Sequence, residues 1–269
     1  MYVTTRLGRL FYEEAGASAS ADAPAIVLWH SFLCDGGMWD GQVAALGGLG
    51  RVIVFDGHGH GKSDAPPAHT LEEGADALLE ALTALKVKRA ALVGLSWGGM
   101  LAMRIALREP ERVAALALLD TSASPELIAK QLKYRLMLST FRRLGLPRRI
   151  VDRQVVPLMF AHATRAARPD VIARWTTDLE GFSREGVYQT GRAIFWREDI
   201  VPKIGQIKAK TLVLCGAEDV ALPPDRSRII AERIEGSKLV LVPNAGHLST
   251  MDAPSAVTAE LVAFLRDAL

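Results

Sequence analysis

Apolar residues in this chain gather in short continuous runs and do not alternate strictly with polar residues. Six runs have the length of a strand: AIVLW (25–29), VIVF (52–55), AALVG (90–94), VAALALL (113–119), TLVLC (211–215) and KLVLV (238–242). Continuous runs of this kind are typical of strands buried on both faces of a largely parallel sheet.

Helical periodicity fills much of the sequence between these runs. It predicts helices over residues 71–86, 98–109, 225–234 and 254–268. Strands that alternate with helices indicate an α/β fold with a mostly parallel central sheet and flanking helices. Near the N-terminus, the stretch VTTRLGRLFYEE predicts an antiparallel hairpin that turns near Leu7 and Gly8.

The strand pattern stops between about residues 121 and 200. This stretch contains short amphipathic helical patterns punctuated by proline, and the strand pattern resumes after Ile207. We therefore predict an α/β core formed by residues 1–120 and 201–269. Residues 121–200 are expected to form a helical lid inserted between two strands.

Composition narrows the class of protein. The 269 residues are 49% hydrophobic and 23% charged, and the formal net charge of +2 gives no indication of nucleic-acid or membrane binding. The N-terminus lacks a secretory signal, and no apolar stretch approaches the roughly 18 residues of a spanning helix, so we expect a soluble cytoplasmic protein. Cys34 and Cys215 lie beside predicted strands and are expected to be buried free thiols.

The stretch LVGLSWGGM (92–100) contains the first candidate for chemistry. Gly94, Ser96 and Gly98 fit the pattern G-x-S-x-G, with a buried strand before it and an amphipathic helix after it. A serine in so tight a turn needs small neighbours, and its hydroxyl stands at the positive end of the following helix. Ser96 is therefore the predicted nucleophile.

A serine nucleophile needs a base, and the base needs a carboxylate. His247 lies in a glycine-containing loop after the last strand run, and Asp219 follows the run 211–215. The order Ser96, Asp219, His247 is the one expected of an enzyme with a nucleophile elbow. Asp120, at the end of the run 113–119, is an alternative carboxylate because that strand end should face the same crevice.

An oxyanion hole requires two further donors. The backbone N–H of Trp97 follows the nucleophile directly and supplies one. The other is expected from the loop after the run 25–29, which contains Ser31, Phe32 and Leu33.

With these motifs, the chain resembles the α/β-hydrolase fold superfamily over essentially its full length. The matching segments are HSF (30–32), DGHGHGKSD (56–64), GLSWGG (94–99), GAEDVALPP (216–224) and NAGH (244–247). Within that superfamily, HSFLCDGGMWDGQ and RVIVFDGHGHGKSDAP most resemble the 3-oxoadipate enol-lactonase-like serine esterases. The resemblance implies that Phe32 donates the second oxyanion N–H. Ser31 stands where many relatives have glycine, which leaves the polarity of the pocket open.

Two other site types are excluded. Gly61-Lys62-Ser63 imitates the end of a phosphate-binding loop, but that motif needs glycine five positions before Gly61, where this chain has Asp56. No ligand cluster accompanies the histidines of the same stretch, so no metal site is expected. Haloalkane dehalogenases and epoxide hydrolases of the resembled fold use aspartate in place of Ser96, which argues against both activities.

The predicted lid is strongly basic. Residues 130–174 carry eleven Lys or Arg against two acidic residues. Because the whole chain carries +2, the remainder carries −7. These cations either form solvated helix faces, or one or two of the arginines point inward to bind a substrate carboxylate. The cationic residues are Lys130, Lys133, Arg135, Arg142, Arg143, Arg148, Arg149, Arg153, Arg165, Arg168 and Arg174.

Candidate substrate contacts are Ser31, Leu33, Trp175 and Trp196. The aromatic residues of the lid can equally be core residues, as can their neighbours Phe182, Tyr188 and Phe195.

The sequence therefore predicts a serine hydrolase that cleaves a small carboxylic ester or lactone, anionic or neutral, through an acyl-enzyme. This chemistry needs no cofactor. Hydrolysis of a C–C bond and cofactor-free perhydrolysis use the same triad and remain alternatives, and a ligand receptor without turnover is a more remote one. The oligomeric state stays open.

Overall fold

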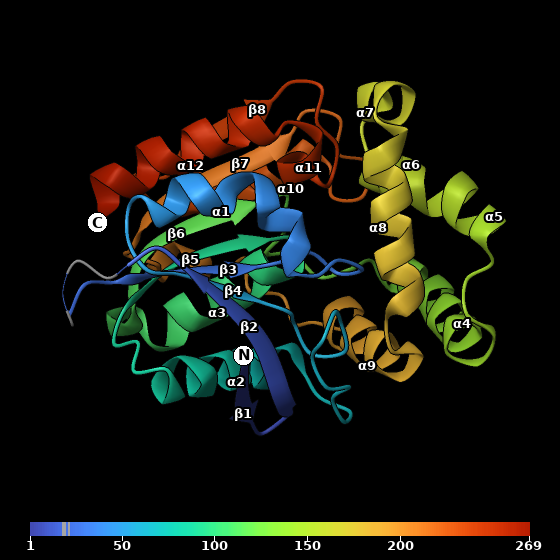
Figure 1. The fold of residues 1–269 in the computed structure, drawn as a ribbon, viewed down its shortest axis with the longest axis horizontal. Helices are drawn as coiled ribbons and strands as arrows, with labels where there is room; N and C mark the ends of the chain where they lie inside the picture. The colour runs from blue at the N-terminus through green and yellow to red at the C-terminus, as the bar shows by residue number, and fades with distance from the viewer. Residues whose placement is uncertain (18–19, 21) are drawn as a thin grey trace.

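The computed structural model describes residues 1–17, 20 and 22–269. Within these residues the strands form one eight-stranded sheet in the order β1-β2-β4-β3-β5-β6-β7-β8 (Figure 1). Their bounds are β1 (Tyr2–Thr5), β2 (Gly8–Ala15), β3 (Ala25–Trp29), β4 (Val52–Phe55), β5 (Ala90–Leu95), β6 (Val113–Leu119), β7 (Lys210–Gly216) and β8 (Lys238–Val242). Strands β1 and β2 pair with each other, and β2 with β4, in antiparallel fashion, whereas all other pairs are parallel.

The predicted strands and fold class are confirmed. Four strands coincide with the apolar runs. Strand β5 extends one residue beyond its run at the C-terminal end, and β7 extends one residue beyond its run at each end. The hairpin of β1 and β2 turns at Arg6 and Leu7. Strands β3, β4 and β5 are buried on both faces, but β8 is an edge strand with only its last residue buried. The prediction, from its continuous apolar run, that this strand is buried on both faces is therefore wrong for β8.

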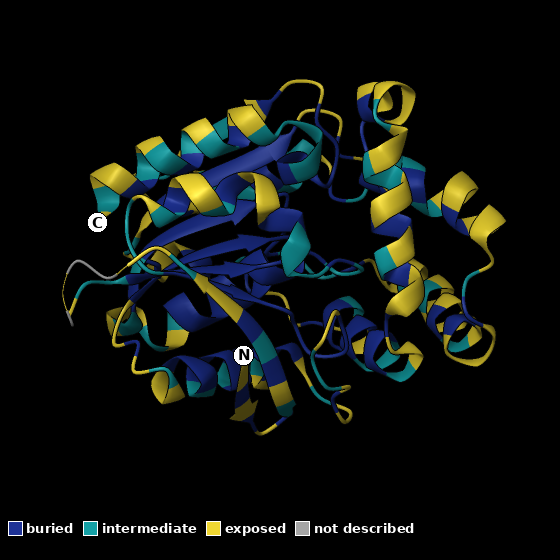
Figure 2. Cartoon of the chain, viewed as in Figure 1, coloured by how far each residue is buried: buried dark blue, intermediate teal, exposed yellow. Residues whose placement is uncertain are grey.

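Two layers of helices cover the sheet, which lies buried between them in Figure 2. On one face, α1 (Asp40–Gly47) packs against α12 (Pro254–Ala268), with the short α11 (Ser249–Asp252) beside them. On the other face are α2 (Leu71–Ala84), α3 (Trp97–Arg108) and α10 (Pro224–Arg233). Thr70 caps α2 with a capping box, in which its side chain and that of Glu73 each accept the other's backbone N–H.

The segment between β6 and β7 is helical, as predicted, and its helices form a group at one end of the sheet (Figure 1). The longest are α4 (Ile128–Leu144), α8 (Pro169–Gly181) and α9 (Arg184–Phe195), and α4 packs closely against α9. Shorter helices are α5 (Arg148–Ile150), α6 (Val156–Met159) and α7 (His162–Ala167), with a π-type turn at Val151–Val155 between the first two. The division into a core and a lid remains a prediction.

Sequence patterns missed α1, α11 and a 3-10 turn at Gly36–Trp39 that leads into α1. The stretch DGQVAALG of α1 has glycines in its first and last turns, and α11 is a single turn, so neither produces a helical apolar stripe. Among the described helices, none has both the length and the apolar character needed to cross a bilayer.

Candidate active site

Ser96 occupies the turn between β5 and α3, with a left-handed backbone at φ 52°. A side chain at Gly94 would place its Cβ 2.2 Å from the backbone of Gly98, and one at Gly98 would lie 2.2 Å from the carbonyl oxygen of Trp29. Both positions therefore require glycine. The turn is further held by the Ser96 N–H, which donates to the Leu119 carbonyl at 2.8 Å. A strained, buried serine at a helix N-terminus matches the predicted elbow.

His247 and Asp219 lie together at the ends of β8 and β7. The ring Nδ1 of His247 lies 2.8 Å from Oδ2 of Asp219, and both residues are buried. The other carboxylate oxygen of Asp219 accepts the Leu222 N–H at 2.9 Å. With Nδ1–H donating to Asp219, Nε2 carries the ring lone pair.

Neighbouring groups fix the loop that carries His247. The N–H of Gly246 donates to the Asp252 carboxylate at 2.7 Å, and the N–H of Leu248 donates to the carbonyl of Met159 at 2.9 Å. Between Ser96 and His247, both described residues, the structure contains no hydrogen bond. Catalytic hydrogen bonds often form only when substrate is bound, so this arrangement is compatible with the pair acting together.

The carboxylates around His247 control its charge. Burial would lower the pKa of His247, but the charge and hydrogen bond of Asp219, helped by the charge of Asp120, outweigh burial and raise that pKa above its ordinary value. The imidazolium form is therefore stabilised in this site.

Asp120, the alternative carboxylate, has other partners. Its Oδ1 accepts the Gly216 N–H at 2.7 Å, and its Oδ2 contacts the hydroxyl of Ser249. Burial and the neighbouring charge of Asp219 raise the pKa of Asp120 to about 8. Asp120 is thus a mostly protonated acid next to the His247–Asp219 pair and makes no direct bond to the imidazole ring.

The two amides assigned to the oxyanion hole are free. Among the described residues, neither the Phe32 N–H nor the Trp97 N–H donates to a protein acceptor. Each of these two N–H groups is therefore available to an oxygen of a ligand. The next residue, Leu33, has a left-handed backbone at φ 63°, which turns this loop sharply.

Sequence reasoning missed the side chains that hold this loop in place. The Leu33 N–H donates to Nε2 of His60 at 3.3 Å, and the Trp175 Nε1–H donates to the Leu33 carbonyl at 3.0 Å. Burial lowers the pKa of His60 to about 3, so the ring is neutral and can accept. Asp56 accepts the Gly36 N–H at 2.8 Å from the same segment. Asp56 and His60 both belong to DGHGHGKSD, a polar stretch directly after a buried strand, and this pattern could have indicated a supporting role.

Comparison with known proteins identifies the family of the chain. Residues 24–254 match the model of the family described as the alpha/beta hydrolase fold. The chain belongs to the α/β-hydrolase family. It is therefore a hydrolase, and the predicted resemblance is confirmed.

Two solved structures and one curated protein illustrate the relationship. An enol-lactonase from Burkholderia xenovorans LB400 is 31% identical with a TM-score of 0.91, over 99% of this chain and 100% of that one. A thermophilic esterase from Thermogutta terrifontis, solved with malate bound, is 30% identical with a TM-score of 0.91, over 100% and 99%. A protein of Caulobacter sp. (strain K31) named as a carbamate hydrolase, RutD, is 28% identical over 95% of each chain.

One group in this hydrolase has the residue types of a metal site. Ligand atoms of Asp120, Cys215 and Asp219 lie within 4.8 Å of one another, and all three residues are buried. The carboxylate oxygens already take part in the hydrogen bonds described above, and burial raises the pKa of the Cys215 thiol, which disfavours the thiolate that binds metals. These residues therefore fit a buried hydrogen-bonded cluster better than a metal centre.

Cys34 and Cys215 are both buried free cysteines, as predicted.

The candidate substrate contacts lie in different surroundings. Ser31 is fully buried, and its hydroxyl has no protein partner in the described structure. Trp175 is buried against Phe160, and its hydrogen bond to the Leu33 carbonyl holds the loop that contains Phe32 and Leu33 in place. Trp196 is 41% exposed and lines a cavity that Ser96 does not line.

The basic residues of the lid mostly face solvent. Of the eleven cations between residues 130 and 174, ten are exposed, and Arg168 is half-buried with its guanidinium donating to the Met251 carbonyl at 2.9 Å. Arg174 pairs with Asp40, and Arg148 with Asp152. This placement favours solvated helix faces over an arginine directed at Ser96.

Proposed function

We propose that the protein hydrolyses a small carboxylic ester or lactone through an acyl-enzyme formed on Ser96. The observation that carries this proposal is the 2.8 Å contact of His247 Nδ1 with Asp219, which leaves Nε2 as a base in a site that also contains the strained Ser96. The enol-lactonase and esterase relatives, 31% and 30% identical, support it.

In the acylation step, Ser96 Oγ attacks the substrate carbonyl carbon while His247 Nε2 takes its proton. The carbonyl oxygen becomes an oxyanion that accepts from the free N–H groups of Phe32 and Trp97. Asp219 holds the imidazolium and does not itself take the proton. As the intermediate collapses, His247 returns the proton to the leaving alkoxide, which departs as an alcohol or, for a lactone, stays attached as a hydroxyl group.

In the deacylation step, water replaces the alcohol. His247 Nε2 removes a proton from the water, whose oxygen attacks the acyl carbon. The second tetrahedral intermediate expels Ser96, which is reprotonated by His247, and the carboxylic acid is released. Apart from the substrate and water, this cycle requires no group outside the chain.

We place residues 121–200 over this site as a lid. The bond from Trp175 in α8 to Leu33, next to the proposed oxyanion donor, supports this placement. A carbamate ester offers the same carbonyl to Ser96, and the carbamate hydrolase relative makes it the second substrate class to assay.

The test is multiple-turnover hydrolysis of p-nitrophenyl esters from acetate to octanoate, with a δ-lactone and a p-nitrophenyl carbamate in parallel. Ser96→Ala and Asp219→Asn should each lower kcat by about 10³-fold or more, by analogy with other serine hydrolases. Asp225→Asn, at an exposed aspartate of α10, is the matched control and should retain full activity. A folded Ser96→Ala variant that keeps wild-type turnover would overturn the proposal.

A further inference from the structure

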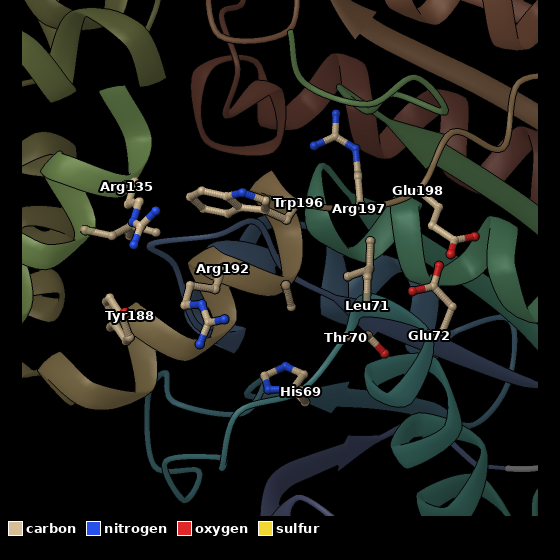
Figure 3. Close-up of a pocket in the computed structure, with 12 residues that line it drawn as sticks. His69, Thr70, Leu71, Glu72, Arg135, Tyr188, Arg192, Trp196, Arg197 and Glu198 are labelled. Atoms are coloured by element: carbon tan, nitrogen blue, oxygen red, sulfur yellow. The ribbon is translucent and has the colours of Figure 1, made fainter. Parts of the chain in front are cut away.

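A cavity of about 620 Å³ lies away from the predicted triad (Figure 3). It is bordered by the start of α2, by α4 and by the C-terminal part of α9. We call it the α4–α9 cavity. None of Ser96, Asp219 and His247 lines it. Its size suits a small-molecule ligand, and its lining combines charged and aromatic groups, as binding sites commonly do.

Two arginines that line this cavity have no carboxylate partner among the described residues. Arg135 of α4 and Arg192 of α9 both line it, and among the described residues neither has a carboxylate within salt-bridge distance. The guanidinium of Arg192 lies 5.9 Å from the ring centroid of Tyr188, which also lines the cavity. Two arginines that line one cavity, neither of them held by a carboxylate, can both bind the same anion.

The remaining charges of the cavity do not neutralise this pair. Arg197 is bound to Glu126 at 3.1 Å, and Glu72 is bound to Arg104 at 2.6 Å. Glu198 has no cationic partner within the described part of the chain, but Figure 3 shows it beside Glu72, at the side away from Arg135. The cavity is therefore cationic at one end and acidic at the other.

An exposed aromatic surface borders the cationic end. In Figure 3 the indole of Trp196 extends toward Arg135, and 41% of the residue is accessible. A planar ring that stacks on this indole would remove apolar surface from water while its substituent reaches an arginine.

The cavity is close to the catalytic loop although it is separate from it. A Cβ at Gly191 would lie 2.7 Å from the side chain of Leu138 and 3.0 Å from the ring of Phe32. Leu138, which lines the cavity, and the ring of Phe32, the proposed oxyanion residue, therefore both lie next to Gly191.

We propose that the α4–α9 cavity binds a small aromatic monocarboxylate, with its carboxylate at Arg135 and Arg192 and its ring on Trp196. The ligand is held there without reaction, so the proposal stands whether or not the ester chemistry proves right.

The experiment is isothermal titration calorimetry of the full chain with phenylacetate and with phenylacetamide, its uncharged counterpart. Phenylacetate should bind at least about tenfold more tightly than phenylacetamide, because only the anion gains charge-assisted bonds. The double variant Arg135→Gln/Arg192→Gln should bind phenylacetate at least about tenfold more weakly, and Trp196→Ala should also weaken it. Arg143→Gln, at an exposed arginine of α4 outside the cavity, is the matched control and should bind like the wild type.

Circular dichroism of each variant verifies that it is folded. No binding of phenylacetate to the wild type, equal binding of the amide, or equal binding by the double variant would each overturn the proposal. Ester turnover is assayed separately, so a failure of this site is distinguishable from a failure of the proposed catalytic function.

Discussion

Asp120 should make the stability of this hydrolase fall as pH rises through the neutral range. Its carboxyl group is fully buried at the end of β6, and burial together with Asp219 raises its pKa to about 8. In the unfolded chain an aspartate has a pKa of about 3.9. Between pH 5 and pH 8 the folded protein therefore keeps a proton that the unfolded chain has lost.

The sign and size of the effect follow from proton linkage. Because the folded state binds more protons, the free energy of unfolding decreases by about 1.4 kcal/mol for each pH unit in this window. Over the three units from pH 5 to pH 8 the loss attributable to Asp120 is about 4 kcal/mol, and above pH 8 the curve levels off. Asp120→Asn removes this loss. An asparagine can still accept the Gly216 N–H and donate to Ser249, and it tolerates the left-handed backbone at this position, where φ is 46°.

The assay is urea unfolding of both proteins at pH 5, 6, 7 and 8. Relative to the wild type, Asp120→Asn should gain about 4 kcal/mol between the first and last of these pH values. Titrating groups outside the cluster of Asp120, Asp219 and His247 are shared by the two proteins and largely cancel in this difference. Asp225→Asn, at an exposed aspartate, should show no such trend. A difference between Asp120→Asn and wild type that stays constant across the range would refute a buried, proton-holding carboxyl group.

Substitutions at three further positions test the packing of the fold. Gly98→Ala forces a Cβ to within 2.2 Å of the Trp29 carbonyl and should cost about 2 kcal/mol or more in urea unfolding, with a loss of esterase activity because the elbow must shift. Thr70→Ala removes the capping box of α2 and should cost about 1 kcal/mol while activity is unchanged. Glu126→Ala leaves the buried guanidinium of Arg197 without its carboxylate and should lower stability by about 3 kcal/mol, and Glu126→Gln, which keeps an acceptor oxygen, should cost less.

The sheet could be predicted from the sequence because its signal is local. A strand buried on both faces, such as β3, needs an unbroken apolar run, and no solvent-facing side chain interrupts that run. The same argument failed in part at β8, whose run is also apolar although only its last residue is buried. An edge position depends on which strands lie beside it, and that is a property of the whole sheet.

The candidate triad could be proposed from the sequence because parallel topology converts chain order into position. Ser96, Asp219 and His247 each follow a strand of the parallel sheet, and parallel strands bring their C-terminal ends to one edge. The rule does not choose between Asp120 and Asp219, since both follow neighbouring strands. The choice depends on side-chain direction: Oδ2 of Asp219 lies 2.8 Å from His247 Nδ1, while Oδ2 of Asp120 contacts Ser249.

The positions of side chains within the predicted lid could not be predicted from the sequence, for the opposite reason. Its charge was evident from composition, but composition cannot say which faces of α4 and α9 are turned toward each other, and that packing decides where an arginine side chain ends. Of the two unpaired arginines in the α4–α9 cavity, Arg135 belonged to the basic segment identified from sequence, whereas Arg192 lies beyond it. The two line one cavity only because α9 packs against α4 after the 39 residues of chain that lie between Leu144 and Arg184. The proposed anion site is thus formed by the contact between two helices, and the proposal would be tested at both of them.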